Sequence, residues 1–148
     1  MEVVSHVFGF VGAGHDTGDC RLREDVFEEE LLKKPGDIDL LIGYASLLEK
    51  SDKDKAILTY KNALEFDPDN AIALFNLGAL YYAKGKTLFD LSQKTSVKKQ
   101  YDLLLKEALT DFEVARPYFE QALAEDPSSL ETIQALKTIA FVVDDQPS

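Results

Sequence analysis

The same spacing of residues occurs twice in this 148-residue chain and constrains its fold more than any other feature. An alanine is followed by an aromatic residue four positions later, by a second alanine after seven and by Asp-Pro at the end. Spacings of four and seven place side chains on one face of a helix, and proline cannot continue a helix. The pattern therefore predicts two amphipathic helices that end at Asp-Pro, and its members are Ala56, Tyr60, Ala63 and Asp67-Pro68, then Ala115, Phe119, Ala122 and Asp126-Pro127.

A second type of helix precedes each of these, with large residues around a small one. Its members are Leu41, Tyr44, Ala45 and Leu48 in the first copy, and Leu74, Leu77, Gly78 and Tyr81 in the second. Together the paired helices resemble the tetratricopeptide repeat (TPR), in which such units stack because one unit cannot bury its own apolar face. The resemblance implies an all-α fold, a short right-handed array of antiparallel helix-turn-helix units.

The second unit is longer than the family pattern. Pro68 and Pro127 lie 59 residues apart, against about 34 in one repeat. The additional residues between Gly85 and Ala115 keep helical spacing, so we predict one elongated helical hairpin that turns near residues 94–96. This stretch resembles the elongated repeats of Bacteroides-like bacteria. Pro117 lies inside the second long helix, where we expect a kink and continuation of the helix.

Shorter segments flank the two units. A helix predicted from Glu24 to Lys34 resembles the second half of a degenerate repeat, with Glu30 at a position where the family has alanine. A capping helix is predicted after Ser129. The resulting division is a glycine-rich arm of uncertain structure at 1–23, a TPR-like domain at 24–143 and a disordered tail at 144–148.

Composition excludes several classes of function. The net charge of −11 disfavours nucleic-acid binding, because phosphates would be repelled. Cys20 is the only cysteine, so no disulfide can form within the chain. The apolar stretch Val3 to Val11 is too short for a membrane span. We therefore expect a soluble protein of the cytoplasm or, if a preceding signal is removed, of the periplasm.

The N-terminal arm carries two weak motifs. Gly12 and Gly14 after an apolar run resemble the start of a dinucleotide-binding fingerprint, but Thr17 stands at the third glycine position. A second group, His15, Asp16, Asp19 and Cys20, contains residue types that bind zinc, although they lie together on one predicted loop rather than in two spaced pairs. We expect neither a cofactor nor a metal site here.

Catalytic side chains are scarce. The two histidines, His6 and His15, both lie in the arm, so the usual general base is missing from the helical repeats. The acidic run of residues 28–30 is typical of a solvated helix face. The sequence therefore predicts that the protein is not an enzyme.

Family geometry assigns partner binding to particular positions on the first helix of each unit, which line a concave groove. Phe75 and Tyr82 are the aromatic members, and the alternative is that both rings belong to the core. A clamp for C-terminal carboxylates, known in chaperone-binding members, is absent because Ile42, Ser46, Glu131 and Ala135 replace its basic and amide residues. The predicted groove residues are Ile42, Ser46, Ile72, Phe75, Asn76, Ala79, Tyr82, Gln134 and Thr138.

These observations lead to one preferred function and two alternatives. The preferred function is a non-catalytic scaffold that binds a peptide or helix of another protein in the groove. The first alternative is a structural role, in which the exposed edge of the incomplete N-terminal repeat forms a homo-oligomer. The more remote alternative is nucleotide or metal binding through the arm.

Overall fold

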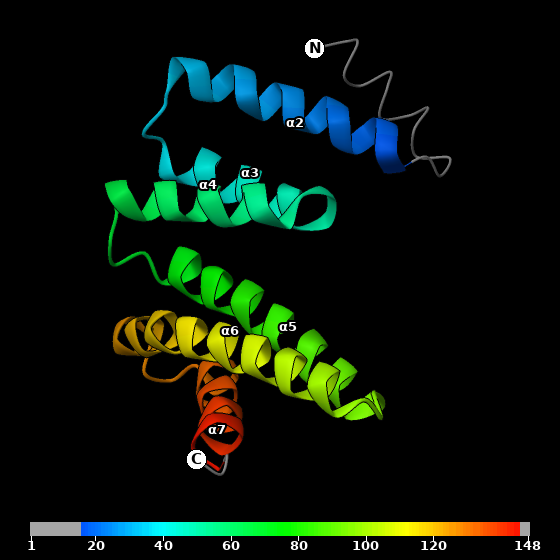
Figure 1. The fold of residues 1–148 in the computed structure, drawn as a ribbon. Coiled ribbons are helices and arrows are strands. Elements are labelled where there is room, and N and C mark those ends of the chain that lie inside the picture. Colours follow the sequence, from blue (N-terminus) through cyan, green and yellow to red (C-terminus); the bar gives the residue numbers. More distant parts are fainter. Residues whose placement is uncertain (1–15, 146–148) are drawn as a thin grey trace. The chain divides into compact units, whose positions relative to one another are not determined.

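The described part of the chain, residues 16–145 of a computed structural model, consists of six α-helices and contains no strand (Figure 1). The helices form two compact units, and the boundary between the units lies between Phe66 and Asp67. The first unit contains α2, α3 and α4, and the second contains α5, α6 and α7. The all-α prediction is confirmed.

Helix α2 (Asp16–Lys33) begins before Glu24, where the sequence predicted its start. Arg21, Leu22 and Arg23 are good helix formers, and a single glycine at position 18 costs only about 1 kcal/mol in a helix. The helix packs on α3 through Phe27, whose ring stacks on Tyr44 with a centroid separation of 5.8 Å. The predicted half repeat is therefore a longer helix docked on the first full unit.

Helices α3 (Ile38–Ser51) and α4 (Lys53–Phe66) form a tight hairpin. Asp37 caps α3 by accepting a hydrogen bond from the amide of Leu40 at 3.1 Å. Asp52 forms the whole turn: its amide donates to the carbonyl of Leu48 at 2.7 Å, and its carboxylate accepts from the amide of Lys55 at 3.1 Å. One residue therefore ends α3 and caps α4.

The side chains predicted to face the core of this hairpin are buried. They share a relative exposure of 5% or less, and they are Leu41, Tyr44, Ala45, Leu48, Ala56, Tyr60 and Ala63. Ile57, which the repeat pattern did not include, is buried as well. The hydroxyl of the fully buried Tyr60 donates to the carboxylate of Glu49 at 2.5 Å. The phenol is thus buried with a hydrogen-bond partner, which removes most of the cost of burying it.

The elongated hairpin of the second unit consists of α5 (Ala71–Lys94) and α6 (Lys98–Glu125). Its turn at residues 95–97 confirms the predicted position. A Cβ atom added to Gly85 would lie 3.0 Å from both the carbonyl oxygen of Ala108 and the ring of Phe112. The absence of a side chain at Gly85 therefore permits the two long helices to approach closely at this point.

Helix α6 continues through Pro117, as predicted. Proline has no amide hydrogen to donate to the carbonyl of Glu113, so one helical hydrogen bond is missing. Buried residues on both sides of the proline, Ala115 and Phe119, hold the helix against its neighbours. Their packing offsets the missing bond.

Helix α7 (Leu130–Asp144) packs on the hairpin and begins after Ser129, whose hydroxyl accepts from the amide of Thr132 at 3.3 Å. One buried cluster of this unit contains Ala108, Phe112, Ala115, Phe119, Ile139 and Val142. At the predicted tail, Asp144 still belongs to α7, and residues 146–148 lie outside the described residues. The proposed division into arm, domain and tail stays a prediction.

Candidate functional site

Two aromatic side chains of α5 lie partly in the core and partly at the surface. The ring of Phe75 meets that of Phe119 edge-on at 5.7 Å, and the ring of Tyr82 lies 5.5 Å from Phe112 and 6.2 Å from Phe119. Both α5 residues retain intermediate exposure. The two predicted alternatives, core and groove, therefore both describe these rings in part.

The exposed parts of the rings face two surface hollows between α5 and α7. The first has a volume of about 220 Å³ and is bordered by Phe75, by the end of α6 and by the start of α7. The second has a volume of about 470 Å³ and is bordered by Tyr82 and by α7. Glu131 lies in the wall of both hollows. We refer to the two hollows together as the α5–α7 groove.

Local and packing interactions hold α7 on the hairpin, where it borders the two hollows together with α5. Ser129 caps the helix, and the hydroxyls of Ser129 and Thr132 are 2.8 Å apart. Thr132 is 1% exposed and Ile139 is fully buried, so one face of α7 faces the core. The residues on the adjoining face, including Glu131 and Gln134, then border the groove.

The rim of the groove is apolar and acidic. Ile72 from α5 and Leu130 from α7 are 59% and 79% exposed. Asp126 and Glu131 supply carboxylates, and the residues that line the two hollows include no lysine or arginine. Such a surface favours ligands that combine apolar side chains with positive charge.

The structure brings five of the nine predicted groove residues to this groove: Ile72, Phe75, Asn76, Tyr82 and Gln134. Ala79 packs against the core cluster instead. The hydroxyl of Thr138 donates to the carbonyl of Gln134 at 3.0 Å, and Thr138 borders neither hollow. Ile42, half-buried, and Ser46, exposed, lie on α3 in the first unit. That these nine residues contact a partner stays a prediction.

Sequence reasoning omitted Leu130 from the groove. This residue follows the cap Ser129 directly, and its side chain is 79% exposed. A large apolar residue there is the signal that could have identified it.

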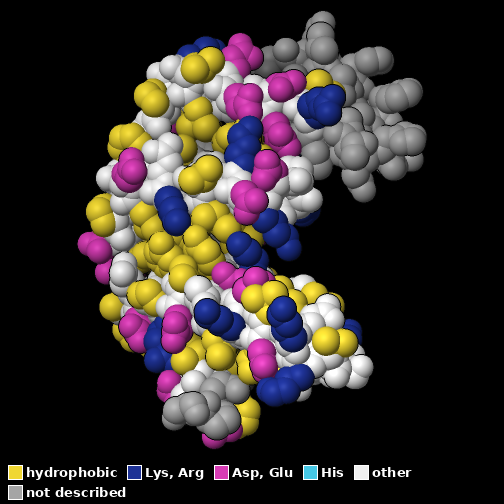
Figure 2. Space-filling view, viewed as in Figure 1, with side chains coloured by type: hydrophobic (Ala, Val, Ile, Leu, Met, Phe, Trp, Pro, Cys, Tyr) yellow, Lys and Arg dark blue, Asp and Glu magenta, His cyan; other side chains and the backbone are white. Residues whose placement is uncertain are grey.

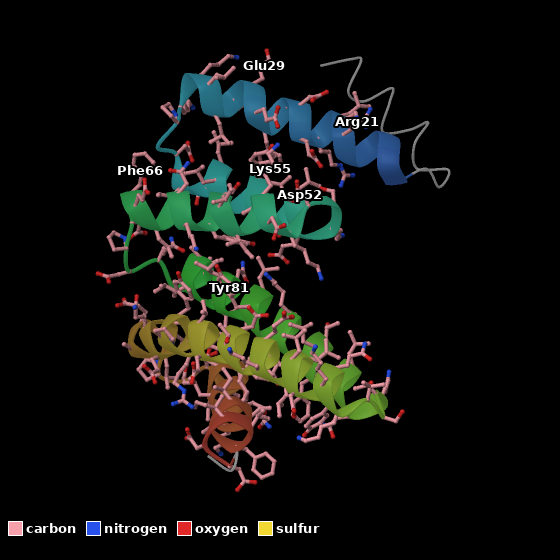
Figure 3. The ribbon with its side chains drawn as sticks, viewed as in Figure 1. Arg21, Glu29, Asp52, Lys55, Phe66 and Tyr81 are labelled. Carbon is pink, nitrogen blue, oxygen red and sulfur yellow. The ribbon has the colours of Figure 1, made fainter. Side chains whose placement is uncertain are left out.

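A polar cluster in the first unit joins α2 to α3 and α4. Glu28 accepts hydrogen bonds from the hydroxyl of Tyr44 at 2.5 Å and from the ammonium of Lys55 at 2.9 Å. Figure 3 shows Lys55 on the side of α4 that faces α2. The hydrogen bond from Tyr44, and then that from Lys55, lower the pKa of Glu28. Burial raises the pKa of Tyr44, and hydrogen bonds with Tyr44 and Glu28 raise that of Lys55.

This cluster is structural in character. The ammonium of Lys55 lies 5.4 Å from the centre of the Tyr44 ring, and the hydroxyl of Ser51 donates to Glu24 at 2.7 Å. The first contact lies within the α3–α4 hairpin, and the second connects α2 to it. Together with the hydrogen bonds that Glu28 accepts, the contact of Glu24 fixes α2 to the α3–α4 hairpin.

Two further predictions concern a metal site and a membrane span, and the described part of the chain bears on both. No group of three or more His, Cys, Asp or Glu side chains that could hold a metal ion occurs there. The glycines at 12 and 14 and His15 of the two arm motifs lie outside the described residues, as do the side chains of Asp16, Asp19 and Cys20. Among the described helices, none is long and apolar enough to cross a membrane.

Comparison with known proteins agrees with the repeat pattern. The family model for the TPR repeat matches residues 46–85. A curated relative, interferon-induced protein with tetratricopeptide repeats 2 of Cricetulus griseus, is 34% identical over 87 residues. That alignment covers 58% of this chain and 18% of the relative.

A solved structure matches over more of the chain. It is a protein of Bacteroides ovatus, provisionally described as a protein binding protein, with a TM-score of 0.65 and 23% identity. The match covers 86% of this chain and 66% of the other. The likeness shows that the two proteins share their fold, as the resemblance of the elongated hairpin predicted.

Proposed function

We propose that this chain, whose residues 46–85 match the model of the tetratricopeptide repeat, is a non-catalytic scaffold that binds a peptide or a helix of another protein in the α5–α7 groove. The observation that carries the proposal is the position of Phe75 and Tyr82. Core contacts hold each ring, and part of each ring borders a hollow at the surface.

Rigid aromatic side chains are effective anchors for a partner. They supply a large apolar contact area and lose little conformational entropy on binding, because the core already holds them. The buried ring of Phe119 contacts both Phe75 and Tyr82 and holds their rings in place. The groove is thus preorganised, which lowers the free-energy cost of binding.

The rim indicates the chemistry of the ligand. Exposed Ile72 and Leu130 would contact apolar side chains, while Asp126 and Glu131 would attract lysine or arginine. The proposed ligand is therefore a short segment that carries both apolar and basic residues. The names of the two similar proteins, which refer to TPR repeats and to protein binding, are consistent with this class of function.

The test uses residues that can change without loss of the core. Replacement of Phe75 or Tyr82 by glutamate would disturb the packing on Phe119. A variant that unfolds for this reason also loses binding, so the two effects could not be separated. Ile72→Glu and Leu130→Glu alter exposed side chains instead. Leu58→Glu, at a position 67% exposed on α4, is the matched control.

Peptides selected by the intact chain from a random phage-displayed library are titrated by calorimetry into each variant. The proposal predicts that the selected peptides carry apolar and basic residues. The double variant Ile72→Glu with Leu130→Glu should weaken peptide binding about tenfold or more, since hot-spot residues each contribute over 1 kcal/mol to binding. Leu58→Glu should bind like the intact chain. Failure to select any peptide, or equal binding by all three proteins, would contradict the proposal.

A further inference from the structure

Charge is unevenly distributed along the chain, and the elongated hairpin is its basic part. Residues 84–106, around the hairpin turn, contain six lysines and two aspartates. The rest of the chain contains ten basic and 25 acidic residues. The hairpin end therefore has a net charge of +4, whereas the remainder of the chain has −15.

Both aspartates of the hairpin end are already paired. Asp90 forms an ion pair with Lys86 at 3.1 Å, and Asp102 forms one with Lys98 at 3.1 Å. Lys99 and Lys106 are exposed and form no ion pair with any residue that the structure describes. Their positive charge is available to another molecule.

These two lysines lie on one face of α6 with an exposed leucine between them. Lys99, Leu103 and Lys106 are separated by four and three residues, which is the spacing of one helix face. Leu103 is 58% exposed and borders a hollow of about 490 Å³, together with Leu88 of α5, two lysines and the carboxylates of Glu107 and Asp111 at its far end along α6. We call Lys99, Leu103, Lys106 and Leu88 the lysine face. Figure 2 shows dark-blue lysines among yellow apolar side chains on this hairpin.

Helix α2 carries a surface of opposite character. Leu22 and Val26 are 44% and 47% exposed one turn apart, and the exposed carboxylates Asp25 and Glu29 lie beside them. Figure 3 shows that Glu29 points away from α3 and α4. Neither Asp25 nor Glu29 forms an ion pair with a described residue. We call these four residues the acidic face.

We propose that the lysine face of one copy of this protein docks on the acidic face of α2 in a second copy. The two faces match in chemistry, because each has a short apolar centre with two unpaired charges, and the charges are opposite. Such a pairing buries leucine and valine side chains together and places lysines next to carboxylates. Because two different surfaces meet, the contact is head-to-tail and can add further copies.

Other anionic partners fit less well. A membrane or a nucleic acid presents negative charge over a wide area, so the −15 of the remaining chain would oppose binding. The described part of the hairpin end also lacks arginine, and its one tyrosine, Tyr101, is only partly exposed. Bases are usually recognised by stacking on exposed aromatic or arginine side chains. A compact acidic helix face avoids both difficulties.

The test is sedimentation equilibrium of the intact chain from about 5 to about 500 µM, a range that detects weak association. In 0.1 M NaCl the average mass should rise above the monomer mass of 16.5 kDa as concentration increases. In 1 M NaCl association should weaken about fivefold or more, because the screening length falls from about 10 Å to about 3 Å.

Charge-reversed variants identify the two faces. Lys99→Glu with Lys106→Glu should weaken association about tenfold or more, and Asp25→Lys with Glu29→Lys should do the same, since like charges would then meet. A mixture of the two variants should associate again, because the reversed hairpin of one fits the reversed α2 of the other. Lys50→Glu with Lys53→Glu, at two exposed lysines of the first unit, is the control and should associate like the intact chain.

Circular dichroism of each variant shows whether it is folded. A strictly monomeric intact chain at the highest concentration would overturn the proposal. An equal effect of the control variant, or no association in the mixture of two folded variants, would overturn it as well. None of these results depends on peptide binding in the α5–α7 groove, so the two proposals can fail separately.

Discussion

Phe119→Ala is the substitution whose cost follows most directly from the packing of the second unit. Phe119 is 1% exposed, and its ring contacts Phe75 and Tyr82. Removal of a buried phenylalanine ring costs about 3–5 kcal/mol, and the cost rises with the volume of the remaining cavity. The cavity here would lie against Gly78, which has no side chain to fill it. We therefore expect Phe119→Ala to lower the free energy of unfolding by about 4 kcal/mol or somewhat more.

The matched control is Phe141→Ala in the same unit. Phe141 is 71% exposed, so its removal should change stability by about 0.5 kcal/mol or less. The assay is urea unfolding followed by circular dichroism. With a urea dependence of about 2 kcal/mol per M, Phe119→Ala should lower the unfolding midpoint by about 2 M.

Both substitutions remove the same ring, so equal midpoints for the two variants would show that the burial of Phe119 does not stabilise the fold. A loss below about 1 kcal/mol for Phe119→Ala would show that neighbouring side chains collapse into the space. Phe75 and Tyr82 would then be mobile rings, and the preorganised groove would lose its physical basis.

Three further predictions concern a cap, a close helix contact and pH. Asp37→Ala removes the carboxylate that caps α3 and should cost about 1 kcal/mol in urea unfolding, while Asp37→Ser should retain most of the stability. Gly85→Leu places a side chain against the Ala108 carbonyl and should destabilise the protein by about 1–3 kcal/mol despite the better helix propensity of leucine; unchanged stability would show that the hairpin can separate there. The folded protein lowers the pKa of Glu28, so the ionised carboxylate of Glu28 stabilises the fold above its ordinary pKa of 4.5, and this contribution is lost as the pH falls. The difference in the free energy of unfolding between the intact chain and Glu28→Gln should therefore shrink from pH 6 to pH 3. A difference that stays constant with pH would show that ionisation of Glu28 does not stabilise the fold.

Most of the helical architecture follows from local features of the sequence. The Asp-Pro ends, the caps Asp37 and Ser129 and the periodic apolar residues are all short-range signals, and helices form where they predicted. The elongated hairpin was also predictable, because the residues between Gly85 and Ala115 keep helical spacing. Helix ends are weaker signals, which explains why α2 begins earlier than predicted.

The candidate site was only partly predictable, because it depends on contacts between residues distant in the sequence. The spacing of Phe75 and Tyr82 fits both a core and a groove. Only their ring contacts with α6 and the hollows that they border beside α7 show that each ring belongs to both. The cluster of Glu28, Tyr44 and Lys55 joins three helices, and no spacing within one helix reveals it. Leu130 was missed because repeat patterns emphasise periodic positions, and the first residue of a helix falls outside them.

The most direct test of the central claim is photo-crosslinking from within the groove. A photoreactive phenylalanine analogue replaces Gln134, an exposed residue that borders the second hollow, or replaces Leu58 on α4 as the control. Each protein is irradiated with a library-selected peptide and examined by mass spectrometry. Binding in the α5–α7 groove predicts a peptide crosslink from position 134 and none from position 58. A crosslink from position 58 alone would contradict the claim that partners bind in the α5–α7 groove.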